Sequence, residues 1–421
     1  MRIWIVHQNA YAPPESAGTR HFELARRLIA RGHDVLIVAT SFYHKSKVET
    51  RLYDGESWAR ETILGVPYLW IKTPAYGNGA LGRMWNWAVF MARIWRGTGL
   101  SEQAPPDVVV GSSPPLTSAF AARGLARKLR VPFVLEVRDL WPLTLLEVGG
   151  HSPRHPVIRG LAAMERSLYR SADRIISLLP AAEEWIRTVA PKAAPVTWIP
   201  NGVDLEAMYV SAASTGDATF DVVYAGAHGR ANGLASIVDA AALMSGETDA
   251  DGREIRFHFF GDGPEKGELK ARAVRERVTN VHFHDPVPKT DIPGILAEAD
   301  AFVVTLKHSP LYKYGMSLNK LFEYLAAGRP IVFGGDAVND PVAEAGAGIS
   351  VAPEDPRALA EAVRTLAALS GAERQAMCER GRVYARAHHD FDLLAVRFET
   401  VLEEARAGSK TDPISRPLAR V

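Results

Sequence analysis

The chain contains a single cysteine, Cys378, among 421 residues. One thiol excludes an internal disulfide framework and a zinc site built from several cysteines, and it suits a reducing, cytoplasmic compartment. No apolar run reaches the roughly 18 residues that a membrane-spanning helix needs. The opening residues, Met1 to Val6, have the apolar pattern of a strand, so we expect no signal peptide.

Net charge is also small, +1 over the whole chain, but the charges are unevenly placed. Residues 1–204 hold 25 Lys and Arg against 17 Asp and Glu, whereas residues 205–421 hold 24 against 31. One interpretation is that the charged residues are divided between the two halves by chance. The other is an N-terminal half that meets something anionic, either phosphates or a lipid surface. Chain length and a 47% apolar content favour a globular protein of two domains.

Short apolar segments alternate with loops and amphipathic helices in both halves, which predicts an α/β protein with doubly wound parallel sheets. In the first half, strands are expected over 3–7, 34–39, 107–111, 132–137, 172–178 and 196–199. In the second half, strands are expected over 220–224, 257–261, 281–283, 301–305 and 331–333.

The segment 315–335 reads GMSLNKLFEYLAAGRPIVFGG. Its apolar residues recur every three or four positions, which predicts a helix over 317–327 with Ser317 as its N-cap. Gly328 and Pro330 supply the stop signal. A short buried strand is expected directly afterwards.

The start of that helix has the properties of a phosphate site. Free backbone N–H groups and the positive end of the helix dipole favour an anion. Gly315, followed by Met316 and Ser317, permits close approach, and Lys320 adds a positive charge. Glu323 lies about 9 Å along the axis from Ser317, where a carboxylate could accept hydrogen bonds from ribose hydroxyls. The alternative is an ordinary capped surface helix.

The run from Glu323 to Pro330 resembles the signature of the family-4 retaining glycosyltransferases of the GT-B fold. In that signature, the second of two glutamates eight positions apart precedes an alanine-rich turn, a glycine and a proline. The first glutamate's position is Gly315, so the chain departs from the family's usual sugar contact and keeps the ribose contact. The longer motif GMSLNKLFEYLAAGRPI, residues 315–331, resembles that of a branch that builds bacterial O-antigen and capsule sugars, including N-acetyl-L-fucosamine transferases.

The resemblance implies two Rossmann-like domains that face each other across a central cleft. Residues 1–200 would bind the acceptor and residues 201–390 the nucleotide-sugar, with an interdomain hinge at Pro200 to Asp204. A final helix over 391–407 would pack back on the first domain. Residues 408–421 are expected to form a flexible tail.

The resemblance also implies donor-binding positions outside the helix. In the loop 225–233, the family usually has basic residues at the positions that Ala227 and Asn232 occupy here. Arg230 is expected to take over the phosphate role, with the Gly229 amide and Lys320. The further expected donor-binding residues are Gly18, His228, Gly263 and Val287.

Two polar residues follow the strand 132–137, where catalytic groups gather in open α/β sheets. Asp139 is expected to activate the acceptor hydroxyl, and Arg138 is expected to lie near a phosphate or the acceptor. The alternative is that Asp139 caps a turn before Trp141.

Residues 77–97 combine tryptophans with arginines, which is typical of a helix lying in a bilayer interface. Arg83, Trp85, Arg93 and Trp95 are the expected acceptor or membrane contacts. The alternative is a core helix whose arginines extend to the surface.

The family resemblance implies that a sugar moves with retention from a nucleotide-sugar, expected to be UDP-linked, to a lipid-linked polysaccharide or O-antigen acceptor at the inner face of the cytoplasmic membrane. No metal, other cofactor or nucleic-acid partner is expected. Asp390-Phe391-Asp392 fits an Asp-x-Asp metal pattern but precedes a periodic helix, so it is interpreted as a helix cap. Two alternatives remain: a sugar-nucleotide 2-epimerase of the same fold, and a non-catalytic nucleotide- or glycan-binding module.

Overall fold

The structure is a computed structural model that describes residues 1–13, 19–44, 46–52, 55–77, 79–208 and 219–408. The described chain forms two compact units. Unit 1 contains residues up to Pro200 together with the helix α15, and unit 2 contains Asn201–Asp390. The predicted donor contact Gly18 and the predicted tail from residue 409 onward lie outside the described residues.

Unit 1 is built on an eight-stranded sheet with the order β10-β9-β8-β7-β1-β2-β6-β5. All neighbouring pairs are parallel except the edge pair β5–β6. Its strands are β1 (Arg2–Val6), β2 (Asp34–Thr40), β5 (Trp58–Ile63), β6 (Val66–Ile71), β7 (Val108–Ser113), β8 (Phe133–Val137), β9 (Arg174–Ser177) and β10 (Val196–Trp198). A separate small hairpin joins β3 (Phe42–Tyr43) to β4 (Val48–Glu49).

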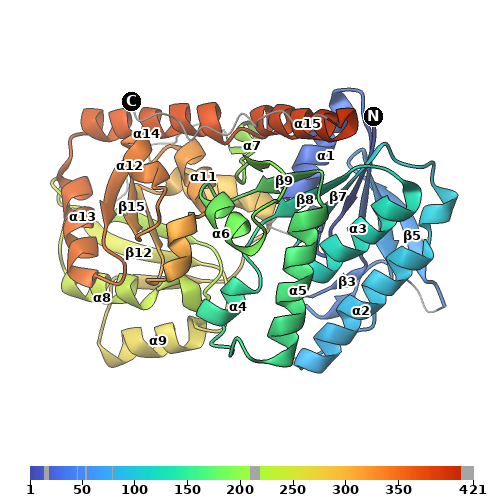
Figure 1. Ribbon diagram of the computed structural model, residues 1–421. Coiled ribbons are helices and arrows are strands. Elements are labelled where there is room, and N and C mark those ends of the chain that lie inside the picture. The colour runs from blue at the N-terminus through green and yellow to red at the C-terminus, as the bar shows by residue number, and fades with distance from the viewer. Residues whose placement is uncertain (14–18, 45, 53–54, 78, 209–218, 409–421) are drawn as a thin grey trace. The chain divides into compact units, whose positions relative to one another are not determined.

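Helices cover both faces of this sheet, so its central strands are apolar on both sides. On one face, α1 (Arg20–Ala30) and α15 (Phe391–Ala407) pack together and share a core with β1 and β2. On the other, α2 (Ala80–Arg96), α3 (Leu116–Leu129) and α5 (Pro156–Ser171) lie side by side (Figure 1). The shorter elements are η1 (Leu100–Glu102), α4 (Leu143–Glu147) and α6 (Ala182–Val189).

Unit 2 has a six-stranded parallel sheet with the order β13-β12-β11-β14-β15-β16. Its strands are β11 (Thr219–Ala225), β12 (Glu254–Phe260), β13 (Val281–His284), β14 (Ala301–Thr305), β15 (Ile331–Gly334) and β16 (Gly348–Val351).

Two hydrophobic clusters fill the space between this sheet and its helices. The first contains side chains of α8 (Ala235–Leu243), α9 (Lys266–Arg275) and α13 (Pro356–Ala368). The second contains side chains of α10 (Ile292–Glu298), α11 (Asn319–Ala327), α12 (Pro341–Ala345) and α14 (Gly371–His388). The short elements are α7 (Leu205–Met208), η2 (Arg230–Asn232), η3 (Lys289–Asp291) and η4 (Pro310–Tyr314).

Both sheets reverse their strand order at one point. In unit 1 the reversal lies between β1 and β7, and in unit 2 it lies between β11 and β14. Ligands of open α/β sheets bind beyond the carboxyl ends of the strands at this switch point. Ligands are therefore expected at two places: the loops after β1, β7 and β8 in unit 1, and the loops after β11 and β14 in unit 2.

The predicted fold class, α/β with two Rossmann-like domains, is confirmed. The strands β5, β6 and β16 lie within residues 58–71 and 348–351, where the sequence predicts no strand. Among the described helices, none combines the length and apolar content required to span a bilayer.

Candidate active site

The helix α11 begins two residues later than the sequence predicts. Its first residue is Asn319, and its N-cap is Leu318, which makes no side-chain capping bond. The hydroxyl of Ser317 instead accepts a hydrogen bond from the backbone N–H of Asn201, at 2.8 Å. The prediction that Ser317 caps the helix is therefore wrong. Because the N-cap side chain makes no such bond, the start of α11 can offer its N–H groups to an anion.

The loop before α11 is held in place by its backbone. Gly315 has a φ of +101°, which is strained for any residue with a Cβ. The side-chain amide of Asn339 donates to the carbonyl of Met316 at 3.0 Å, and its oxygen accepts from the Met316 N–H at 2.8 Å. The N–H of Met316 is therefore already engaged and is not free to bind a phosphate.

Lys320 lies in the first turn of α11, facing the end of β11. Its Nζ donates hydrogen bonds to the Tyr224 hydroxyl at 2.6 Å and to Oδ1 of Asn232 at 3.1 Å. Loss of solvent lowers the pKa of Lys320 to about 7, although the charge of Glu323 opposes the shift. A Cβ at Gly226 would lie 3.1 Å from this Nζ, so the glycine allows the lysine to approach the backbone. The cation therefore sits at the switch point of unit 2.

Glu323 lies on the next turn of α11 and forms an ion pair with Lys289. Its side chain is only 15% exposed. Lys289 begins η3, two residues after the expected donor contact Val287. An ionised carboxylate has about four lone-pair sites, so one ion pair leaves room for ribose hydroxyls.

The loop after β11 is closed by side chains around the carbonyl of Ala227. This carbonyl accepts hydrogen bonds from the Tyr224 hydroxyl at 2.7 Å and from the Asn232 amide at 2.8 Å. Asn232 thus connects the loop to Lys320, at a position where the family usually has a basic residue. Arg230 is exposed and Gly229 is half-buried on the same loop. Arg230 is free to move toward a ligand because no side-chain bond holds it within the described structure.

His228 is fully buried, with its ring close to Tyr224, Phe259 and Phe283. Burial, followed by the nearby charge of Lys266, lowers the pKa of its imidazole to about 4, so the ring is neutral. At Gly263 a Cβ would lie 2.4 Å from the His228 carbonyl oxygen, so only glycine lets the two loops meet. This placement does not support the predicted donor contact by the His228 side chain.

The ends of β12 and β13 are joined by Lys266. Its Nζ donates to the carbonyls of Gly261 at 2.9 Å and His284 at 2.8 Å. Val287 follows in the next turn and is half-buried. The backbone that leads to the expected donor contact Val287 is therefore anchored at its beginning.

In unit 1, Arg138 and Asp139 directly follow β8. Asp139 is exposed and Arg138 is half-buried. The turn is closed by a backbone hydrogen bond from the Trp141 N–H to the Asp139 carbonyl, at 3.0 Å. The alternative interpretation, in which the carboxylate caps this turn, is therefore not what the structure has.

Sequence reasoning missed a buried polar cluster behind these two residues. Glu136 in β8 binds Nε of Arg20 at 2.9 Å and Nε2 of His21 at 2.8 Å, and it also accepts from the Ser112 hydroxyl. Arg20 additionally donates to the carbonyls of Ile199 and Pro200. The available signal was a single acid inside an otherwise apolar strand, because a buried charge requires a partner.

The helix α2 exposes some of the side chains that the sequence predicts to contact a membrane or the acceptor. Trp85 is 63% exposed and Arg83 is also exposed. Trp95, 41% exposed, packs near Phe120. Arg93 donates to the carbonyls of Ser57 at 2.9 Å and Lys72 at 2.7 Å. The Nη1 of Arg93 thus ties α2 to the neighbouring segments, and its predicted acceptor or membrane contact stays a prediction.

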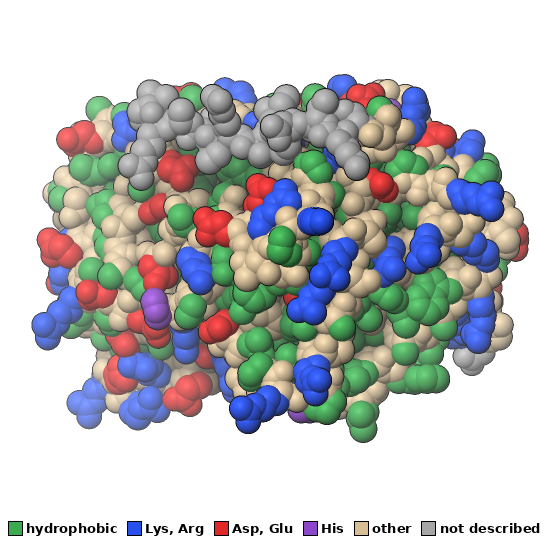
Figure 2. All heavy atoms as spheres, viewed as in Figure 1, with side chains coloured by type: hydrophobic (Ala, Val, Ile, Leu, Met, Phe, Trp, Pro, Cys, Tyr) green, Lys and Arg blue, Asp and Glu red, His purple; other side chains and the backbone are tan. Residues whose placement is uncertain are grey.

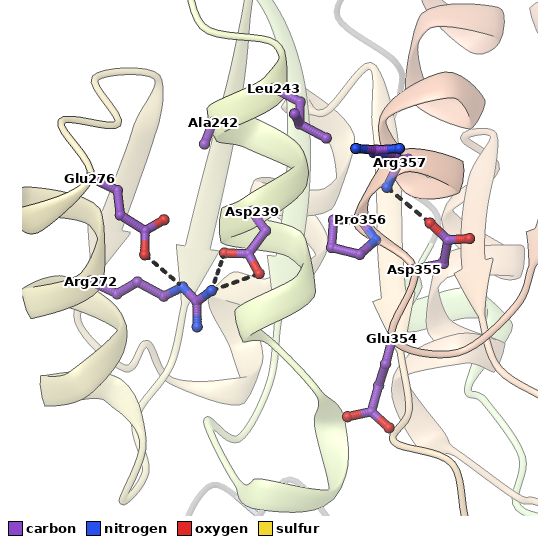
Figure 3. A pocket seen from close by; sticks show the side chains of 9 residues that line it. All are labelled: Asp239, Ala242, Leu243, Arg272, Glu276, Glu354, Asp355, Pro356 and Arg357. Carbon is purple, nitrogen blue, oxygen red and sulfur yellow. Dashed lines mark hydrogen bonds and ion pairs between the residues drawn. The ribbon is translucent and has the colours of Figure 1, made fainter.

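A shallow pocket lies elsewhere in unit 2, between α8, α9 and the start of α13 (Figure 3). Its Arg272 is already paired with Asp239 and Glu276, and the Asp355 carboxylate caps α13. This pocket contains none of the predicted site residues.

Within the described residues, no three His, Cys, Asp or Glu side chains are grouped as a metal site requires. Asp392 lies in the first turn of α15 and pairs with Arg27.

Comparison with known proteins assigns a domain to each half of the chain. Residues 17–202 match a glycosyl transferase 4-like domain, and residues 219–368 match the glycosyl transferases group 1 domain. A probable glycosyltransferase, WbjE of Pseudomonas aeruginosa, is 24% identical over 65% of this chain and 70% of its own. These matches do not favour the epimerase alternative.

Two solved structures are similar over nearly the whole chain. Sucrose-phosphate synthase from Thermosynechococcus elongatus has a TM-score of 0.75 at 17% identity and covers 97% of this chain and 100% of its own. HepE of Anabaena, in complex with UDP and glucose, has a TM-score of 0.66 at 16% identity and covers 96% and 100%. At these identities the likeness concerns the fold.

Proposed function

Because this chain is a glycosyltransferase of the GT-B fold, we propose that it transfers a sugar from a UDP-sugar to a lipid-linked bacterial polysaccharide or O-antigen acceptor, with retention of configuration. Unit 2 binds the donor and unit 1 receives the acceptor. The motif around α11 further favours the branch that includes N-acetyl-L-fucosamine transferases. A structural neighbour that holds UDP and glucose supports the choice of nucleotide.

One observation carries the proposal. At the switch point of unit 2, the uncapped start of α11 coincides with the cation Lys320, and Glu323 lies one turn further along. A departing diphosphate needs preorganised N–H donors and positive charge, and these groups supply both. We propose that Lys320, Arg230 and the helix start compensate the negative charge of the leaving diphosphate without a metal ion. Sugar transfer should therefore continue in excess EDTA.

Asp139 is proposed to activate the acceptor hydroxyl, because its exposed carboxylate lies beyond the carboxyl end of β8 and is not used to close the turn. Arg138 lies beside it.

The chemistry of unit 1's helical face supports a lipid-linked acceptor. The helices α2, α3 and α5 contain nine Lys and Arg residues and one acid, Glu165, which is buried. Figure 2 shows cationic side chains interspersed with hydrophobic ones over these helices. Arginines beside exposed Leu81 and Trp85 suit an anionic membrane surface. We therefore propose peripheral binding at the inner face of the cytoplasmic membrane.

The donor half is tested by UDP binding and sugar release. Glu323→Ala should weaken UDP binding about tenfold, because a charge-assisted hydrogen bond to ribose contributes roughly 1.5 kcal/mol. Asp139→Ala should keep UDP affinity and lower turnover by about 10²-fold or more. Calorimetric titration with UDP and a UDP-sugar turnover assay with a membrane-lipid extract measure the two effects.

The control for this pair is Glu354→Ala, an exposed acid in unit 2 outside the proposed site. Unchanged UDP affinity in Glu323→Ala would remove the ribose role. Epimer formation without acceptor would support the epimerase, and binding without any turnover would support a binding module.

The membrane proposal makes a separate prediction. Trp85→Ser combined with Arg83→Glu should reduce co-sedimentation with anionic vesicles several-fold, because it removes an interfacial aromatic and reverses one charge. Arg93 is left intact because it holds the fold. Val274→Ser with Lys270→Glu likewise removes an exposed apolar side chain, 79% exposed, and reverses one positive charge on α9, and should leave sedimentation unchanged. Equal losses in both double variants would contradict a specific membrane face.

A further inference from the structure

Arg138 is a cation without an acceptor. Its Nε is buried and has no hydrogen-bond partner, and the described residues provide no ion pair or hydrogen bond for the rest of its guanidinium. Arginine stays charged and presents five N–H donors in a planar fork. A buried donor left unpaired is costly, which calls for an explanation in a native structure.

The buried acid next to it does not supply that acceptor. Glu136 already binds Arg20, His21 and the Ser112 hydroxyl. Burial by itself would raise its pKa, but the charges of Arg20 and Arg138 and the hydrogen bond from His21 hold the pKa of Glu136 well below its usual range. The carboxylate is thus ionised, and its charge is matched by that of Arg20.

The other ionisable groups around Arg138 do not balance its charge either. Burial lowers the pKa of His21, against the pull of Glu136, and burial with the nearby charge of Arg138 lowers the pKa of His7 well below its usual value. Both imidazoles are therefore neutral at pH 7. Burial raises the pKa of the Asp139 carboxyl group, and the nearby charge of Arg138 opposes this shift, but the two side chains form no ion pair within the described structure. Within the described structure, the guanidinium of Arg138 is thus left without a hydrogen bond or an ion pair.

His7 adds an acceptor at the same edge of the sheet. Its Nε2 lies 2.9 Å from the Pro114 carbonyl, which can only accept, so Nε2 carries the proton. Its Nδ1 is then an acceptor, and this atom is buried without a partner. Within the described residues, a guanidinium without a hydrogen-bond partner and an unused imidazole nitrogen thus occur where β1, β7 and β8 end, at the switch point of unit 1.

We propose that Arg138 binds a phosphoryl group of the acceptor, as a bidentate guanidinium–phosphate pair, while the Nδ1 of His7 accepts a hydrogen bond from a neighbouring hydroxyl. A phosphorylated sugar or a lipid diphosphate saccharide carries both groups. This inference rests on the proposed function, in which unit 1 receives the acceptor. The planar fork of arginine matches two phosphate oxygens, which a lysine ammonium cannot do.

The test separates this site from the donor diphosphate site by filling the latter first. Inorganic pyrophosphate is titrated calorimetrically into the full chain at saturating UDP. The wild type should bind pyrophosphate, and Arg138→Gln should bind it at least tenfold more weakly with unchanged UDP affinity. Arg138→Lys should be intermediate, because it keeps the charge and loses the fork. Arg159→Gln, an exposed arginine of α5, is the matched control and should bind as the wild type does.

Two results would overturn the proposal. One is wild-type protein that binds no pyrophosphate once UDP is saturating. The other is Arg138→Gln protein that loses UDP affinity instead, which would assign the guanidinium to the donor diphosphate. A chain that fails to bind UDP at all would instead contradict the proposed function. Thermal melting of each variant, with Arg138→Lys as the conservative case, distinguishes lost binding from lost folding.

Discussion

Lys320 holds its proton differently from a surface lysine. Loss of solvent brings its pKa to about 7, with Glu323 opposing the shift. An unfolded lysine titrates near pH ~10.4, so between about pH 7 and 10 the unfolded chain binds more protons. The contribution of Lys320 to folding stability therefore rises with pH across that window. The affinity for a diphosphate should change with pH in the opposite direction and fall as pH rises, because the anion favours the charged lysine.

UDP affinity should consequently fall by up to about tenfold per pH unit above pH 7, since binding then takes up one proton. Calorimetry in two buffers of different ionisation enthalpy measures that proton. Lys320→Met should bind UDP more weakly at pH 6.5 and should lose this pH dependence. The same pH slope in both proteins would show that another group takes up the proton.

The element that matters most for the donor site is α11, and its end is as constrained as its start. Gly328 closes the helix with a φ of +68°. A Cβ at this position would lie 2.4 Å from Nε of Arg382 on α14. The left-handed conformation is the main reason for glycine here, because the Arg382 side chain is flexible and can move away from a Cβ.

Gly328→Ala should lower the free energy of unfolding by about 1–2 kcal/mol, because alanine disfavours the left-handed conformation. Gly294→Ala is the control, because Gly294 lies inside α10 with no atom near the added Cβ, and alanine favours helix there. Chemical denaturation of both variants gives the difference. If the two glycines tolerated alanine equally, the end of α11 would be less constrained than described.

At the scale of the whole molecule, the chain crosses between units twice. After unit 2 is complete, α15 returns to the core of unit 1 with Phe398, Leu394 and Leu402, all fully buried. The folding of unit 1 thus depends on residues almost 200 positions after Pro200. Because all nine tryptophans lie within residues 1–200, tryptophan fluorescence reports on unit 1.

Phe398→Ala should destabilise unit 1 by about 3–5 kcal/mol through a cavity in its core. The denaturant midpoint measured by tryptophan fluorescence should fall accordingly. Leu366→Ala makes a comparable cavity in the core of unit 2 and should leave that midpoint nearly unchanged. Equal shifts in the fluorescence midpoint would mean that the two units unfold as one.

The sequence by itself determined the elements and the family. Apolar periodicity is a local property, so it located most strands and the helices that follow them, and the run from Glu323 to Pro330 marked the donor helix. Tertiary structure decided which side chains meet. Lys320 finds Tyr224 and Asn232 at separations of 96 and 88 residues, and Glu136 finds Arg20 and His21 at 116 and 115. Tertiary structure also pairs the Ser317 hydroxyl with the Asn201 N–H and the Arg93 guanidinium with two backbone carbonyls. It leaves the Nε of Arg138 without a hydrogen-bond partner. Such pairings arise from strand order, which brings remote loops to one edge of a sheet and leaves no periodic signal in the chain.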